Sequence, residues 1–88
     1  MRKMVTRSEL VSLINGELSQ LGVPDGIRAV EGVFRLRAPD SDGVNWSDQL
    51  SFTRGPGDVV EFYLNDIQAA VHWARTKYNL TPENDPPF

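Results

Sequence analysis

The polar residues of this 88-residue chain that could do chemistry are concentrated in one segment, residues 39–48. Its letters, PDSDGVNWSD, place carboxylate and amide oxygens at alternate positions around a glycine, as calcium-binding loops do. If Gly43 takes the invariant glycine position, however, Ala38 stands where the first carboxylate belongs and Gln49 where the bidentate glutamate belongs. We therefore predict no metal and no cofactor, and interpret the segment as a long hairpin loop with local Asp and Asn turn bonds.

Two residues of this loop, Asn45 and Trp46, are nevertheless candidates for contact with a small ligand or a partner. The letters DGVNWS around them, with a capped helix before and an ARTKYNL ending after, resemble a group of small uncharacterised bacterial α/β proteins. The resemblance implies a bacterial origin and a cytoplasmic location. It carries no known activity.

Arginines form a second candidate site. Arg35 and Arg37 are expected to project from one face of a strand, where they could bind a phosphate or an acidic partner, although Glu31 partly offsets their charge. An α-β-β-β-α order resembles double-stranded-RNA-binding domains, but that family has lysines at the start of its last helix, where this chain has Asn65–Gln68. The net charge of −3 also disfavours nucleic acid as a main partner.

Catalytic motifs are missing from the sequence. His72 is the only histidine, and no nucleophile, carboxylate or H-E-x-x-H spacing accompanies it. The chain has no cysteine, which excludes disulfides and thiolate chemistry. The Gly-Pro-Gly at residues 55–57 lacks the lysine and the length of a phosphate-binding loop, so we interpret it as a turn. We assign no catalytic residue and expect a non-enzymatic protein.

The elements that position these residues begin with a helix over Thr6–Leu21. Thr6-Arg7-Ser8-Glu9 matches the capping box, and apolar residues recur at helical spacing up to Gly22, a helix-ending residue with Pro24 beyond it. Two strands follow, Ile27–Arg37 and a half-buried stretch from Trp46 to Thr53, which pair most simply as an antiparallel hairpin. We expect residues 1–5 to be a loose or extended lead-in.

The last long apolar stretch, Asp58–Asn79, supports two hypotheses. It is one long helix capped by Asp58, with Phe62 away from the main apolar stripe. Alternatively, Val59–Leu64 is a strand, and Asn65 caps a shorter helix. The fold class is therefore α+β, as α-β-β-α or α-β-β-β-α, with the helices on one face of a small antiparallel sheet.

Residues 1–80 are expected to form one domain and residues 81–88, with three prolines, a flexible tail. No apolar run approaches the roughly 20 residues that span a bilayer, and no signal peptide follows Arg2 and Lys3. We expect a cytoplasmic protein without membrane contact.

Trp73 is difficult to place in the core, because it lies about 100° from the stripe residue Ala74, on a flank that also carries Ala69. An exposed apolar flank often marks an interface. The alternative is that the first helix or the tail covers the ring. The leading hypothesis is a small interaction or accessory domain that forms a homodimer through this flank; the alternative is a small-ligand or nucleic-acid binder that uses the arginine face.

Overall fold

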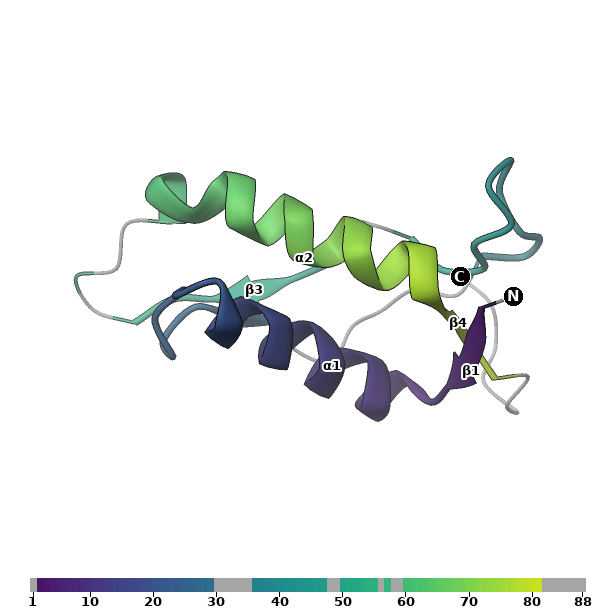
Figure 1. The fold of residues 1–88 in the computed structure, drawn as a ribbon, viewed down its shortest axis with the longest axis horizontal. Helices are drawn as coiled ribbons and strands as arrows, with labels where there is room; N and C mark the ends of the chain where they lie inside the picture. Colours follow the sequence, from purple (N-terminus) through teal and green to yellow (C-terminus); the bar gives the residue numbers. More distant parts are fainter. Residues whose placement is uncertain (1, 30–35, 48–49, 56, 58–59, 82–88) are drawn as a thin grey trace.

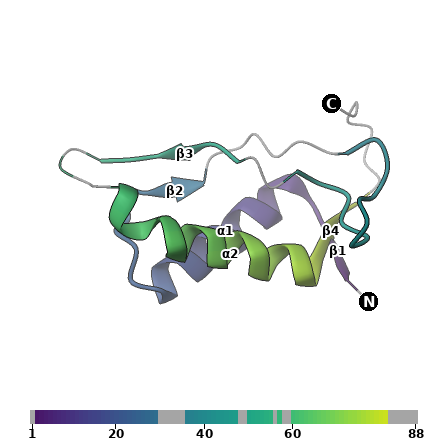
Figure 2. The same cartoon turned by 90° about the horizontal axis from the view of Figure 1, so that it is seen from above.

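The computed structural model describes residues 2–29, 36–47, 50–55, 57 and 60–81, which form a small α+β fold. Its elements are, in order, β1 (Lys3–Val5), α1 (Arg7–Gln20), β2 (Arg28–Ala29), β3 (Phe52–Thr53), the 3₁₀ helix η1 (Val60–Tyr63), α2 (Leu64–Lys77) and β4 (Tyr78–Leu80). The two helices lie side by side and antiparallel, with β2 and β3 on one side of the pair (Figures 1 and 2). Neither helix is long and apolar enough to cross a membrane within this part of the chain.

The first helix forms where its local signals place it. The Thr6 hydroxyl accepts from the Glu9 N–H at 3.1 Å, and the Glu9 carboxylate accepts from the Thr6 N–H at 3.0 Å, so the capping box is confirmed. At the other end Gly22 has a φ of +83°, and Val23 donates back to the Leu18 carbonyl at 3.0 Å. This is the Schellman arrangement, in which a glycine at positive φ ends a helix.

The start of the second helix differs from both hypotheses. Val60–Tyr63 is a 3₁₀ helix that continues directly into α2, so a strand over these residues is wrong. One continuous helical stretch is close to the structure, and Phe62 is 79% exposed, as that hypothesis requires. The proposed cap, Asp58, lies outside the described residues. The helix ends at Lys77 rather than Asn79, because the chain turns into β4.

Both ends of the described chain meet in a parallel pair of strands, which the sequence analysis did not predict. Strand β1 precedes α1 and β4 follows α2, and antiparallel helices bring these two ends together (Figure 1). Val5 pairs with Leu80, both are buried, and the Thr81 N–H donates to the Val5 carbonyl at 2.9 Å. The described strands therefore form two small sheets, one of them parallel, in place of a single antiparallel sheet. The lead-in is a strand over Lys3–Val5.

The second sheet is the expected hairpin in shortened form. Strands β2 and β3 are antiparallel, and a further backbone bond of 2.8 Å joins the Leu36 N–H to the Asn45 carbonyl. The paired residues are Arg28 with Thr53, Ala29 with Phe52, and Leu36 with Asn45. In each pair the two residue numbers add up to the same value, as they do along a regular antiparallel ladder. The three pairs therefore belong to one register. Of the expected strands, residues 27, 36–37, 46–47 and 50–51 lie outside β2 and β3, and residues 30–35 and 48–49 are not described.

The core lies between the helix pair, the hairpin and the parallel strands. The helices contribute one buried face each, and the loop before β3 contributes the fully buried Trp46 and Val44. The buried helical residues are Leu10, Val11, Ile14 and Leu18 of α1, and Ile67, Ala70, Val71 and Ala74 of α2. Small alanines on α2 permit close approach of the two helices. The expected flexible tail falls almost entirely on residues 82–88, which are not described.

Candidate functional site

The polar loop at residues 39–46 is ordered by Asp40. One oxygen of its carboxylate accepts from the backbone N–H groups of Asp42 at 2.9 Å and Val44 at 3.1 Å. Its own N–H donates to the Val44 carbonyl at 3.0 Å, and Gly43 completes the turn at a φ of +84°. These are the local turn bonds that the sequence predicted. Among the residues that can be described, no three histidines or carboxylates could hold a metal ion.

Asn45 attaches this loop to the end of the chain. Its amide nitrogen donates to the Leu80 carbonyl at 2.9 Å, and its amide oxygen accepts from the Leu80 N–H at 2.8 Å. Asn79 makes the reciprocal contacts with the loop: its side chain accepts from the Asn45 N–H at 3.2 Å and donates to the Gly43 carbonyl at 3.0 Å. The two asparagines thus pair with backbone as a neighbouring strand would, on the side of β4 away from β1.

Trp46 is the largest fully buried side chain, and Arg75 closes over it. The indole N–H donates to the Tyr78 carbonyl at 3.0 Å, and the Arg75 guanidinium carbon lies 5.4 Å from the centre of the ring. Arg75 also donates to the Trp46 carbonyl and forms an ion pair with Asp40. The Arg75 carbonyl in turn accepts from Arg2 at 2.6 Å. A buried tryptophan that satisfies its N–H is a structural anchor.

The structure brings the two loop candidates together but places them inside the fold. Trp46 has no exposed surface and the Asn45 amide is occupied by Leu80, so neither presents a free group to a partner. Sequence reasoning missed Arg75, which links the loop to α2. The sequence indicates this role of Arg75 only by placing a cation at the edge of the apolar stripe, in the last turn of a helix, where positive charge is favourable.

Asp40 is expected to make the stability of the fold sensitive to acid. The hydrogen bond from the Val44 N–H, with further contributions from the Asp42 N–H and the Arg75 guanidinium, lowers the pKa of Asp40 below its usual 3.8. A carboxyl with a lowered folded-state pKa contributes stability above its unfolded pKa, and this is lost as pH falls through the folded value. The test measures the free energy of unfolding in urea at neutral pH and at a pH below 3.8. We expect this free energy to fall less between the two pH values in Asp40→Asn than in the parent.

The matched control for this experiment is Asp42→Asn, because Asp42 is an exposed carboxylate of the same loop. It should keep the acid sensitivity of the parent. Some sensitivity should survive in Asp40→Asn as well, since the hydrogen bonds from Thr6 lower the pKa of Glu9 in the same direction. Equal acid loss in the parent and in Asp40→Asn would contradict this role of Asp40.

Trp73 and Ala69 lie on one flank of α2 beside its buried stripe, and Trp73 packs partly against the core. Ala69 is exposed, and Trp73 is half-buried with its ring edge against Tyr78, at 5.7 Å between ring centres and an angle of 70°. Tyr78 also borders a surface hollow of about 410 Å³ that α1 and β1 line. The ring is therefore supported on one side by Tyr78 and remains partly open to solvent.

The remaining candidates are Arg35, Arg37 and His72. Arg35 lies outside the described residues, and Arg37 is exposed. His72 is an exposed residue of α2 beside a hollow of about 280 Å³ that Arg2, Asp42 and Arg75 also line. Arg75 is already paired with Asp40 there. Thr76 also lines this hollow, and its hydroxyl donates to the Trp73 carbonyl at 2.7 Å.

Comparisons with protein-family models, with curated proteins and with solved structures found no match to this chain.

Proposed function

We propose that the chain is a small non-enzymatic interaction domain that self-associates through one flank of α2. The flank consists of Asp66, Ala69, Trp73 and Lys77 and is called the α2 flank below. The observation that carries the proposal is the partial exposure of Trp73 beside a complete core face. Trp73 packs partly against the core, and the part of its ring that stays exposed is an aromatic surface available to a second copy.

The four residues form one stripe along the helix. The spacing of three or four residues between successive members keeps them within a narrow sector at about 100° per residue. Asp66 is in the first turn of α2 and Lys77 in its last turn, with the small Ala69 and the large Trp73 between them. Neither Asp66 nor Lys77 forms an ion pair with another described residue. The stripe therefore has opposite free charges at its two ends.

Opposite charges at the two ends make the α2 flank complementary to itself. When two copies pair antiparallel about a two-fold axis, Asp66 of each copy lies opposite Lys77 of the other, and the Trp73 ring lies over the small Ala69. A parallel pair would place like charges against each other, which is unfavourable. Closed two-fold dimers are the commonest soluble oligomers. The charge pattern therefore favours an antiparallel homodimer.

We expect the parent chain to show twice its monomer mass at high concentration in light scattering or sedimentation equilibrium, and to dissociate on dilution. Ala69→Arg should shift it to the monomer, because a long charged side chain would replace the small residue under Trp73. Gln68→Arg is the matched control: it adds the same group at the neighbouring exposed position, about 100° around the helix, and should leave the dimer intact.

Orientation is tested by charge exchange. Asp66→Lys and Lys77→Asp should each weaken the dimer by bringing like charges together, and the double variant should restore it. Trp73→Glu should also give a monomer, and its circular dichroism separates loss of the interface from loss of the fold. A parent chain that stays monomeric at millimolar concentration would overturn the proposal. If the Ala69→Arg and Gln68→Arg variants have equal masses in solution, the α2 flank is not the dimer interface.

A further inference from the structure

A hollow of about 410 Å³ lies beside the paired strands β1 and β4 and continues the surface of the α2 flank. Its apolar lining comes from Val5 of β1, Leu13 of α1 and Tyr78 of β4. Leu13 and Tyr78 are half-buried, so each presents part of an apolar side chain to the hollow. Because the Tyr78 ring contacts the Trp73 ring, a partner seated on the α2 flank can extend into the hollow without a break.

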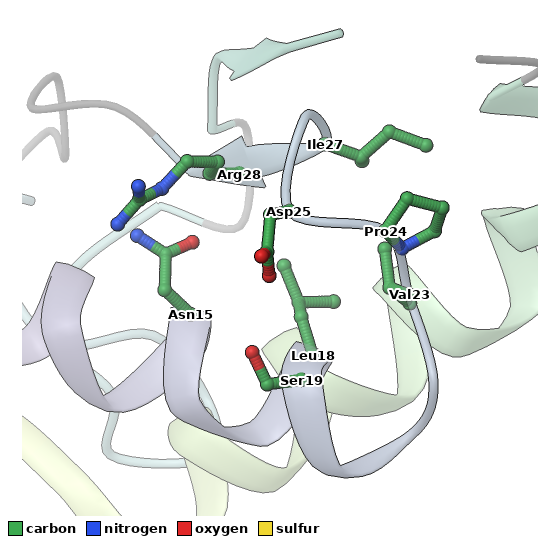
Figure 3. A pocket seen from close by; sticks show the side chains of 8 residues that line it. All are labelled: Asn15, Leu18, Ser19, Val23, Pro24, Asp25, Ile27 and Arg28. Atoms are coloured by element: carbon green, nitrogen blue, oxygen red, sulfur yellow. The ribbon is translucent and has the colours of Figure 1, made fainter. Parts of the chain in front are cut away.

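Another hollow on α1 differs in this respect. It measures about 220 Å³ and lies between the second half of α1 and the turn that leads into β2, with Leu18, Val23 and Ile27 in its wall (Figure 3). These three side chains are only 2–5% exposed, so they offer a ligand almost no apolar surface. An apolar group from outside the fold is therefore better accommodated beside Tyr78.

Phe62 is the side chain that suits the hollow beside Tyr78. At 79% exposure it is the most exposed large apolar residue in the part of the chain that the structure describes. It lies in η1, which continues directly into α2, and it precedes Asp66 by four residues. Residues four apart lie on the same side of a helix, so Phe62 extends the α2 flank by one turn. None of the four residues of η1 is buried, and the Phe62 ring therefore stands in solvent unless another chain covers it.

Antiparallel pairing of two copies brings Phe62 to this hollow. When Asp66 of one copy lies opposite Lys77 of the other, Phe62 lies four residues beyond that pair, which is about 6 Å at 1.5 Å per residue. It therefore passes the end of the other copy's α2 at Lys77 and comes level with β4, which begins at Tyr78. The two-fold axis repeats the contact at the opposite end of the interface.

We propose that the hollow beside Tyr78 receives Phe62 of a second copy, an inference that rests on the proposed dimer. The Phe62 ring packs against the Tyr78 ring, and such aromatic pairs are favoured beyond the apolar area that they bury. The contact also supplies area that the α2 flank lacks. A stable interface contains roughly 20–30 residues a side, far more than the four residues of the flank, and the two Phe62 contacts enlarge it at both ends.

The first experiment truncates the ring. Phe62→Ala should raise the dissociation constant of the dimer by about tenfold or more in sedimentation equilibrium, because each dimer loses two buried aromatic contacts. Leu64→Ala is the matched control: it removes another large exposed apolar side chain, two residues further along and outside the flank, and should leave the dissociation constant unchanged. Both positions are exposed, so circular dichroism should show the fold of the parent in both variants.

The second experiment locates the ring. The chain has no cysteine, so Glu61→Cys next to Phe62 carries a nitroxide spin label at a single position. The spin-labelled chain is mixed with parent chain that contains ¹⁵N, so that only contacts between copies are observed by NMR. The backbone amide signals of Ser8 and Tyr78, which line the hollow, should broaden. The signal of Gly22, beyond the opposite end of α1, should stay sharp.

The outcomes separate this inference from the dimer on which it rests. A dimeric parent whose dissociation constant is the same in Phe62→Ala, or whose Ser8 and Tyr78 signals stay sharp, overturns the inference and leaves the dimer standing. Equal weakening by Phe62→Ala and Leu64→Ala also overturns it, because the effect would then not be specific to the flank. A parent chain that stays monomeric overturns both.

Discussion

Replacing Trp46 by alanine is expected to lower the free energy of unfolding by about 3–5 kcal/mol, the usual range for a buried aromatic residue. The ring has no exposed surface, and it lies under the Arg75 guanidinium. Its removal leaves a cavity and also leaves the Tyr78 carbonyl without the indole N–H. Since a domain of this size is stable by only about 5–15 kcal/mol, Trp46→Ala should unfold at much lower urea concentration, as followed by circular dichroism.

Two variants separate the causes of this loss. Trp46→Phe keeps most of the ring volume but removes the N–H donor, so it should destabilise the fold less than Trp46→Ala does. The unpaired Tyr78 carbonyl should cost about 1–3 kcal/mol, and the smaller ring adds a further loss of packing. Trp73→Ala truncates the other tryptophan, which is half-buried, and should cost less than Trp46→Ala. An equal loss for the two alanine variants would show that Trp46 is not the anchor that its burial indicates.

Asn45→Ala is expected to have the second largest effect, a loss of about 2–4 kcal/mol. Leu80 is fully buried, and the Asn45 amide satisfies both its N–H and its carbonyl. Each group left unpaired costs about 1–3 kcal/mol, and water that enters the site reduces the sum. The measurement is urea unfolding at neutral pH, with hydrogen exchange of the Leu80 amide as a local readout.

Asn65→Ala is the matched control for this prediction, because Asn65 is an exposed asparagine near the start of α2. It should change stability by less than about 0.5 kcal/mol. Asn45→Asp keeps an acceptor for the Leu80 N–H but places a carboxylate against the Leu80 carbonyl, so it should also be destabilising. Retention of full stability in Asn45→Ala would mean that the loop is not attached to β4 through this amide.

The α2 flank was predictable from the sequence in part. The helical period separates Trp73 and Ala69 from the buried stripe, and this angle depends only on local geometry. The T-shaped contact with Tyr78 was not predictable, because Tyr78 was assigned to the helix and lies at the start of β4. That contact decides how much of the Trp73 ring remains open.

The contact between Asn15 and β2 could not be predicted from the sequence. Nothing in the chain order indicates that Asn15 lies against the backbone of β2. Asn15 has the spacing of an ordinary polar residue on a helix flank. Its role appears only when α1 packs beside β2 and the amide meets the Ala29 backbone.

The sequence by itself determined the first helix. The bonds between Thr6 and Glu9 join residues three apart, and the bonds that end the helix at Gly22 and Val23 reach back three to five residues. Bonds this local form wherever the segment is helical. The local turn around Asp40 is of the same kind, since Asp42 and Val44 are its neighbours in the chain.

Only the tertiary structure decided the parallel pairing of β1 with β4 and the place of the polar loop. Val5 and Leu80 are 75 residues apart, and Asn45 and Leu80 are 35 apart, so no local pattern could pair them. A strand of three residues, such as Tyr78–Leu80, is also too short for its alternating pattern to be distinguished from the end of a helix. It forms because antiparallel helices bring both ends of the chain together, and because Asn45, Asn79 and Trp46 satisfy the backbone and side-chain groups that would otherwise be unpaired there.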